Sequence, residues 1–224
     1  MNLANRLATD LASRLDYDEE KRQVMAYGFG AAIQMIQLLC ISLIFGLVFR
    51  CLPECLTVFV AVGLLRRSTG GTHCKTYMAC ILTSSLSVCL MALSCRYTIP
   101  GLPGKELYGL CFELFVFACA TWMGIKRVPM DSPNKPIVSA SKRRRLRRDC
   151  FITLAVYFLI AVTLLVFGWA GERSLSLSCA ITCAVLWQCF TLTAWSGRLA
   201  CSMDKLFAGS MENNDRNEWE RRRQ

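Results

Sequence analysis

The sequence predicts an all-α protein that crosses a membrane several times as a polytopic helical bundle. Apolar residues make up 54% of its 224 residues, yet its formal charge is +10. Apolar spans joined by basic loops account for both values, because membrane helices exclude charge and cytoplasmic loops collect lysine and arginine. At 25.2 kDa the chain has room for about six spans of roughly 20 residues. We expect a single membrane domain over residues 1–224, not a soluble or nucleic-acid-binding protein.

The chain contains 14 cysteines, and most of them lie inside apolar runs. In that setting cysteine behaves as a small hydrophobic residue, so we do not expect a disulfide framework. A tetrahedral zinc site would have to draw on the single histidine, with His73, Cys74 and Cys80 as ligands, and the ligand spacing does not favour it. We therefore expect no metal and no cofactor.

Residues 1–22 predict an amphipathic helix. Leucines recur every four residues from Leu3 to Leu15, while arginines and aspartates fall on the other faces. Such a helix is too polar to span a membrane, so we expect it to lie in the headgroup region or against the bundle.

The apolar segments that follow differ in length. Residues 55–65 form a stretch of only eleven residues, which rises about 16 Å as a helix, roughly half the hydrocarbon thickness. This second segment is expected to re-enter, to tilt, or to extend into its polar flanks. The other segments are long enough to cross: 24–49, 77–94, 108–125, 151–169 and 175–195. From residue 196 the chain is a polar tail, either helical or disordered.

Lysine and arginine are distributed very unevenly between the two sides of a six-segment arrangement. The N-terminus, residues 66–76, residues 126–150 and the tail hold 22 of them, and the other three loops hold four. The positive-inside rule then places both termini and the loop of His73 at the cytoplasmic face of the cell membrane. The basic loop 126–150 is expected to lie next to anionic lipids.

The polar stretch 66–80 is the candidate reactive site. It holds His73, whose side chain titrates near neutrality, and Cys80, a soft nucleophile seven residues later. One continuous helix would separate these residues by about 10.5 Å along its axis, so a dyad requires a break, which we expect at Gly70 and Gly71. Spacing alone leaves a second interpretation open, in which His73 is a loop histidine and Cys80 is one of many buried cysteines.

Two separated motifs resemble the accessory gene regulator B family of Gram-positive bacteria. The first is Arg66 to Cys80, with its arginine, paired glycines, histidine and cysteine; the second is the loop Pro-Met-Asp-Ser-Pro-Asn-Lys-Pro-Ile from Pro129 to Ile137. The resemblance covers nearly the whole chain, including the amphipathic start and the short second segment.

The resemblance implies a membrane cysteine endopeptidase of quorum sensing that cuts the precursor of a cyclic autoinducer peptide. It assigns Cys80 as the nucleophile and His73 as the general base. The acyl-enzyme thioester would be attacked by an internal cysteine or serine of the propeptide, closing a thiolactone or a lactone. Arg66 and Gly71 correspond to the family's site pattern, and Lys135 to its substrate-handling loop.

Three further expectations concern partners and supporting residues. Arg143 and Arg144 would receive an acidic C-terminal region of the propeptide. Asp131 is a candidate third catalytic residue. Cys74 is assigned no role, but it is an alternative nucleophile that mutagenesis must exclude. Two copies of the chain are expected to associate.

A competing hypothesis is a non-enzymatic small membrane transporter or scaffold. In it, Gln34, Gln37 and His73 line a polar path. It requires His73 but not Cys80.

Overall fold

The computed structural model describes residues 3–72, 74, 76–98, 105–130, 139–167 and 171–221, and all of the regular structure in these ranges is helical. The all-α prediction is therefore confirmed. The helices are α1 (Leu3–Arg14), α2 (Glu19–Val48), α3 (Leu52–Thr69), α4 (Tyr77–Leu93) with a π-helical end η1 (Ser94–Thr98), α5 (Lys105–Arg127), α6 (Ala140–Phe167), α7 (Glu172–Thr191) and α8 (Ala194–Arg221).

The chain divides into two compact units, Met1–Ile41 and Ser42–Gln224. In the first unit, α1 is amphipathic as predicted: Ala8 and Ala12 are buried, while Leu3 and Leu7 are exposed. Gly30 of α2 lies against Ala4 of α1. The exposed leucines suit a helix whose apolar face meets the membrane surface.

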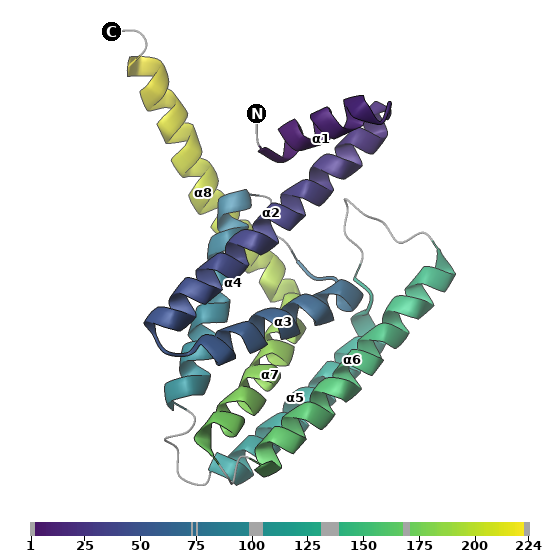
Figure 1. Cartoon of the computed structure of the whole chain (residues 1–224), viewed down its shortest axis with the longest axis vertical. Helices are drawn as coiled ribbons and strands as arrows, with labels where there is room; N and C mark the ends of the chain where they lie inside the picture. Colours follow the sequence, from purple (N-terminus) through teal and green to yellow (C-terminus); the bar gives the residue numbers. More distant parts are fainter. Residues whose placement is uncertain are drawn as a thin grey trace. The chain divides into compact units, whose positions relative to one another are not determined.

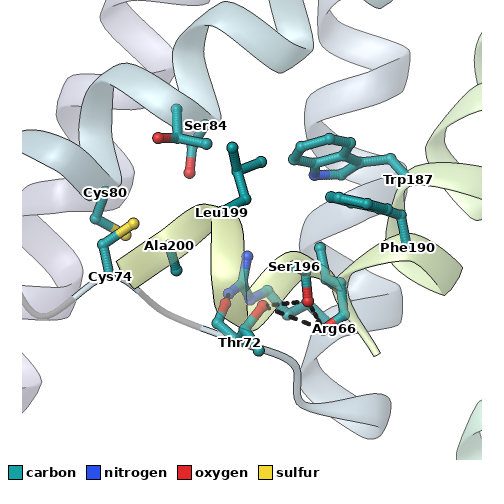
Figure 2. A pocket seen from close by; sticks show the side chains of 12 residues that line it. Arg66, Thr72, Cys74, Cys80, Ser84, Trp187, Phe190, Ser196, Leu199 and Ala200 are labelled. Carbon is teal, nitrogen blue, oxygen red and sulfur yellow. Dashed lines mark hydrogen bonds between the residues drawn. The ribbon is translucent and has the colours of Figure 1, made fainter. Parts of the chain in front are cut away.

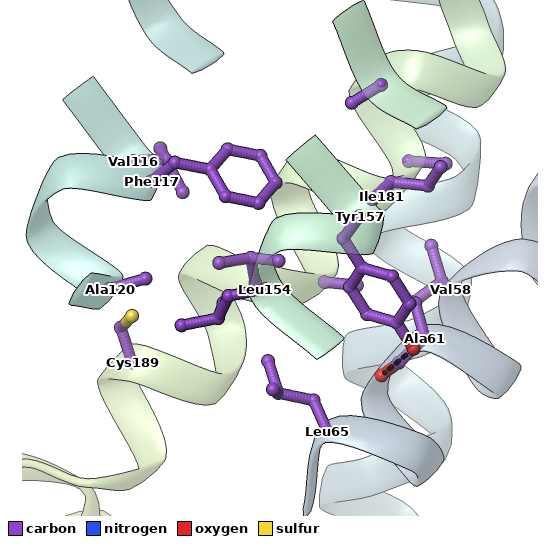
Figure 3. Packing of buried hydrophobic residues seen from close by; sticks show 14 of the residues in the cluster. Val58, Ala61, Leu65, Val116, Phe117, Ala120, Leu154, Tyr157, Ile181 and Cys189 are labelled. Atoms are coloured by element: carbon purple, nitrogen blue, oxygen red, sulfur yellow. Dashed lines mark hydrogen bonds between the residues drawn. The ribbon is translucent and has the colours of Figure 1, made fainter. Parts of the chain in front are cut away.

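The second unit is built around α7, which packs against α3, α5 and α6 (Figure 1). The core between them joins Val58 and Leu65 of α3 to Leu154 of α6 and Ile181 of α7 (Figure 3). The buried Tyr157 hydroxyl donates a hydrogen bond of 3.1 Å to the Ala61 carbonyl, which ties α6 to α3. Large apolar side chains on the outer faces of these helices are exposed, as expected where lipid replaces water.

Five of the described helices are long and apolar enough to cross a membrane: α2, α4 with η1, α5, α6 and α7. This supports a multi-pass membrane protein. The short second segment is the exception, as predicted, but its helix is longer than its apolar run. α3 has 18 residues, begins with Pro53 in its first turn and continues through Arg66 to Thr69. At 1.5 Å per residue it rises about 27 Å, so it extends into both polar flanks.

Two carboxylates are buried among these helices, and both meet serines of α7. Ser176 donates a hydrogen bond of 2.7 Å to Glu54 of α3, and Arg96 of η1 approaches the same carboxylate oxygen at 4.0 Å. Ser178 donates to Glu113 of α5. These polar pairs join helices inside an otherwise apolar core.

One end of the second unit gathers the C-terminal ends of α3, α5 and α7. The Met130 backbone N–H, just beyond α5, donates to the Thr69 carbonyl at 2.9 Å, and Arg127 Nη1 donates to the Leu192 carbonyl at 2.7 Å. The starts of α4 and α8 lie at the same end, because each follows a short connection from α3 or α7. Of the two motifs that the sequence analysis singled out, the described parts, Arg66–Thr72 and Pro129–Met130, therefore lie at this end.

Candidate functional site

The chain leaves the helix at Gly70, where the sequence predicted a break, and the connection to α4, the loop 70–76, is described at residues 70–72, 74 and 76. Gly70 has φ +74° and Gly71 has φ +140°, conformations that favour glycine. A Cβ atom on Gly70 would lie 2.7 Å from the Met130 carbonyl oxygen, and one on Gly71 would lie 2.9 Å from Thr191 Oγ1. Both glycines are therefore required, by backbone conformation and by close contact with α7 and the end of α5.

The loop is held by hydrogen bonds from residues more than 100 positions away. Gln188 of α7 donates from Nε2 to Thr69 Oγ1 and to the Gly70 carbonyl, both at 2.7 Å. The Thr72 backbone N–H donates to the Thr191 carbonyl at 3.2 Å, and Thr72 Oγ1 lies 2.8 Å from Ser196 Oγ of α8. The sequence analysis missed Gln188 and Ser196, because a buried glutamine and a serine near the start of a polar tail carry no local signal.

Arg66 folds back over the same loop. Its Nη2 donates a hydrogen bond of 2.5 Å to the Thr72 carbonyl. The guanidinium also lines a cavity between the loop, α4, α7 and α8 (Figure 2). Arg66 therefore both holds the loop and forms part of the cavity wall.

The cavity measures about 40 Å³ and has one side of thiols and one apolar side (Figure 2). Cys74 and Cys80 lie at one side of it. The opposite wall carries Trp187 and Phe190 of α7, with Leu199 of α8 between the two sides. This volume is large enough for water molecules, but a large peptide side chain would enter only if the walls moved apart.

Cys80 lies in the first turn of α4 and is partly exposed. Its backbone N–H donates to the Thr76 carbonyl at 3.1 Å, the first hydrogen bond of the helix. The opening N–H groups of a helix have no partner within the helix. A carbonyl oxygen bound next to Cys80 would therefore lie close to backbone donors.

Cys74, to which the sequence analysis assigned no role, lines the same cavity, and its thiol is directed towards Cys80 (Figure 2). Burial is the main factor that raises the pKa of the Cys74 thiol, and Cys80 and Asp204 raise it further. Arg66 acts in the opposite direction. The pocket thus contains two thiols, so mutagenesis must distinguish them.

The remaining predicted site residues fall into two groups. His73, Asp131 and Lys135 lie outside the described residues. Arg143 and Arg144 are exposed in the first turns of α6, which begins at Ala140. The basic run is therefore helical, although the sequence analysis treated it as part of a loop; its many arginines are good helix formers and extend the membrane helix beyond its apolar part.

Within the described residues, no group of three or more histidine, cysteine, aspartate or glutamate side chains is arranged to hold a metal ion. Two thiols and an arginine line the cavity, a set of groups that suits nucleophilic chemistry on a carbonyl.

Comparisons with known proteins agree with the sequence resemblance. The family model described as accessory gene regulator B matches residues 4–192. An AgrB-like protein 2 of Clostridium perfringens strain 13 is 29% identical over 197 residues, which cover 86% of this chain and 90% of the relative. An AgrB-like protein of Clostridium perfringens strain SM101 is 28% identical over the same shares. No solved structure matches the chain.

Proposed function

Because the chain belongs to the accessory gene regulator B family, we propose that it is a membrane cysteine endopeptidase that cleaves an autoinducer propeptide and promotes its cyclisation. Membership of this family carries a general role in autoinducer processing. The observation that carries the finer proposal is the position of Cys80, in the first turn of α4 and at the wall of a cavity that Arg66 also lines.

In the proposed reaction His73 accepts the thiol proton of Cys80, and the thiolate attacks the carbonyl carbon of the scissile peptide bond. The tetrahedral intermediate expels the amine of the C-terminal fragment, which takes the proton from His73. The product is an acyl-enzyme thioester on Cys80. His73, neutral again, then accepts the proton of a cysteine or serine side chain within the bound propeptide, and that side chain attacks the thioester carbonyl. The attack closes the ring and expels the Cys80 thiolate, which takes the proton back from His73.

Backbone groups at the start of α4 would stabilise the negative charge that develops on the carbonyl oxygen. This role needs N–H groups with a fixed orientation. The loop 70–76 leads directly into that helix. Arg66 and Gln188 donate hydrogen bonds to it, and the Thr72 hydroxyl of the loop donates one to Ser196. Arg66 and Gly71 would therefore act chiefly by fixing the loop that carries His73, with Arg66 also facing the substrate.

Substrate capture is proposed to use the basic surface of α6. Arg143 and Arg144 are exposed, so they are accessible to an acidic C-terminal region of the propeptide, and Lys135 is assigned to the same task. The same charges would meet anionic lipids if this end lies at the cytoplasmic face, with both termini on that side. Asp131 as a third catalytic residue and the association of two copies also belong to this proposal.

Co-expression of the chain with its propeptide tests the proposal. Wild type is compared with Cys80→Ala, His73→Ala and Cys74→Ala, and mass spectrometry detects cleavage products and peptide linked to the enzyme. We expect an adduct on Cys80 that disappears in the Cys80→Ala and His73→Ala variants and persists in Cys74→Ala. Normal processing by Cys80→Ala would reject the peptidase mechanism and favour a transporter or scaffold.

A further inference from the structure

The C-terminal helix α8 contributes to the pocket, although it lies beyond the region matched by the family model. That match ends at residue 192, and α8 begins at Ala194. Ser196, Leu199 and Ala200 nevertheless line the cavity next to Cys80 (Figure 2). The segment that the sequence analysis treated as a polar tail therefore forms one side of the site.

The start of α8 is fixed against both neighbouring segments. Ser196 is only 5% exposed, and its Oγ lies 2.8 Å from Thr72 Oγ1 and 3.0 Å from the Thr191 carbonyl oxygen. One hydroxyl thus bridges the loop 70–76 and the end of α7. Beyond Ser196, α8 continues in contact with α4.

Two turns later, α8 reaches the start of the helix that carries Cys80. Asp204 Oδ1 accepts a hydrogen bond of 2.8 Å from the backbone N–H of Thr76. Thr76 is the N-cap residue of α4, with φ −84° and ψ 129°, and its own hydroxyl makes no capping hydrogen bond. A side chain 128 residues away in sequence therefore supplies a hydrogen bond at this helix start.

The contact continues directly to Cys80. The Thr76 residue that donates to Asp204 also accepts, at its carbonyl, the hydrogen bond from the Cys80 backbone N–H at 3.1 Å. Only Thr76 therefore separates the carboxylate from the backbone of Cys80. The Asp204 charge also acts on the Cys74 thiol, whose pKa is raised first by burial, then by Cys80 and then by Asp204, and is lowered by Arg66 and a hydrogen bond with Thr83.

We propose that Asp204 is a positioning residue for Cys80: it holds Thr76, fixes the first turn of α4 against the loop 70–76, and so keeps the Cys80 thiol at the cavity. This inference rests on the proposed function in so far as Cys80 is the nucleophile. A displacement of about 1 Å in a reacting group lowers the rate of catalysis by up to roughly a hundredfold. Asp204 and the Cys80 backbone are both hydrogen-bonded to Thr76, so we expect loss of the Asp204 side chain to have a measurable effect on the rate.

The test uses the full chain in membranes and compares wild type with D204A, D204N and K205A. Asparagine keeps the acceptor oxygen for the Thr76 N–H, alanine removes it, and Lys205 is the exposed neighbour of Asp204 on the same helix. For propeptide cleavage, we expect D204A to lower kcat about tenfold and to leave KM within about twofold. D204N is expected to recover most of kcat, and K205A to match wild type.

A second measurement does not depend on the propeptide. In a Cys74→Ala background, iodoacetamide alkylation of Cys80 is followed by mass spectrometry. We expect D204A to speed this reaction about threefold or more, because a released first turn of α4 exposes the thiol more often. In protein that retains Cys74, D204N should move alkylation of Cys74 to lower pH, because it removes a negative charge that raises this pKa.

The outcomes separate the two proposals. If wild type does not cleave the propeptide, the peptidase proposal fails, and the alkylation rates still decide the role of Asp204. If wild type cleaves and D204A has the same kcat, or if D204N is as impaired as D204A, the positioning role is overturned. Equal alkylation rates of Cys80 in D204A and wild type overturn it as well.

Discussion

Two polar regions of the helical bundle differ in what their hydrogen bonds connect. In the interior, Glu54 and Glu113 are almost fully buried, and each accepts a hydrogen bond from a serine of α7. At the end of the bundle, Arg66, Gln188 and Thr72 bond mainly to backbone carbonyls of the loop and of the last residue of α7. The first arrangement joins helices, and the second shapes a loop beside a cavity.

This difference shows that a buried ionisable residue in a membrane helix is not by itself a catalytic signal. Ionisable residues inside a membrane are commonly functional, so Glu54 and Glu113 would be candidate site residues by their position alone. Their partners are serines and an arginine of neighbouring helices, which is a structural arrangement. Two thiols next to a cavity, those of Cys74 and Cys80, lie instead at the end of the bundle.

The largest expected effect is that of Cys80→Ala, which should lower propeptide cleavage by about a thousandfold or more, because the nucleophile is lost. The measurement is the initial rate of cleavage in membranes that contain equal amounts of protein. Cys89→Ala, at another buried cysteine of α4, is the matched control and should retain cleavage. Equal losses in the two variants would mean that α4 tolerates no cysteine replacement. The loss in Cys80→Ala would then be no evidence that Cys80 is the nucleophile.

Gly70→Ala comes next. At φ +74° and ψ −147°, a conformation almost confined to glycine, an alanine is strained by about 1–3 kcal/mol. Its Cβ would lie 2.7 Å from the Met130 carbonyl oxygen. The loop must then shift, and we expect cleavage to fall by about a hundredfold. Gly197→Ala is the control glycine: it lies in α8, and a Cβ there would meet Thr72 Cγ2 at an ordinary 3.9 Å. Wild-type cleavage by Gly70→Ala would show that the loop geometry is not needed.

Glu54→Ala should affect stability rather than chemistry. It leaves the Arg96 guanidinium without the carboxylate near it, and we expect a loss of about 1–3 kcal/mol. Thermal unfolding in detergent measures this loss. Glu54→Gln keeps an acceptor for Ser176 and should lose less. Cleavage per folded molecule should stay within about twofold in both variants, and a selective loss of kcat would instead assign Glu54 to the catalytic machinery.

The smallest effect is expected from joint replacement of Arg143, Arg144 and Arg145 with glutamine. Exposed charges act through screened attraction, so KM for a propeptide with an acidic C-terminal region should rise about threefold to tenfold at low salt and less at high salt. Glutamine at Arg6 and Arg14, two exposed arginines of α1, is the control. An unchanged KM at both salt concentrations would reject a role of these arginines in propeptide binding and leave only contact with anionic lipids.

Much of the fold was predictable because its signals are local. Hydropathy indicated the membrane helices, and the leucine spacing indicated α1. Paired glycines indicated the break at Gly70, since φ values of this kind favour glycine. The boundaries were less predictable: α3 extends through Glu54 and Arg66, two residues that the sequence suggested would lie in loops. Ser176 of α7 binds the Glu54 side chain, and the Thr72 carbonyl binds that of Arg66.

The candidate site divides in the same way. The sequence by itself suggested Cys80, Arg66 and Gly71 as candidates, because they lie within one short motif that resembles a known family. Only the tertiary structure brought Gln188, Ser196 and Asp204 to that motif, across more than 100 residues of chain. The physical reason is that a side chain's hydrogen-bond partner depends on how helices pack, and no local pattern in a buried glutamine or a polar tail records which loop it will meet.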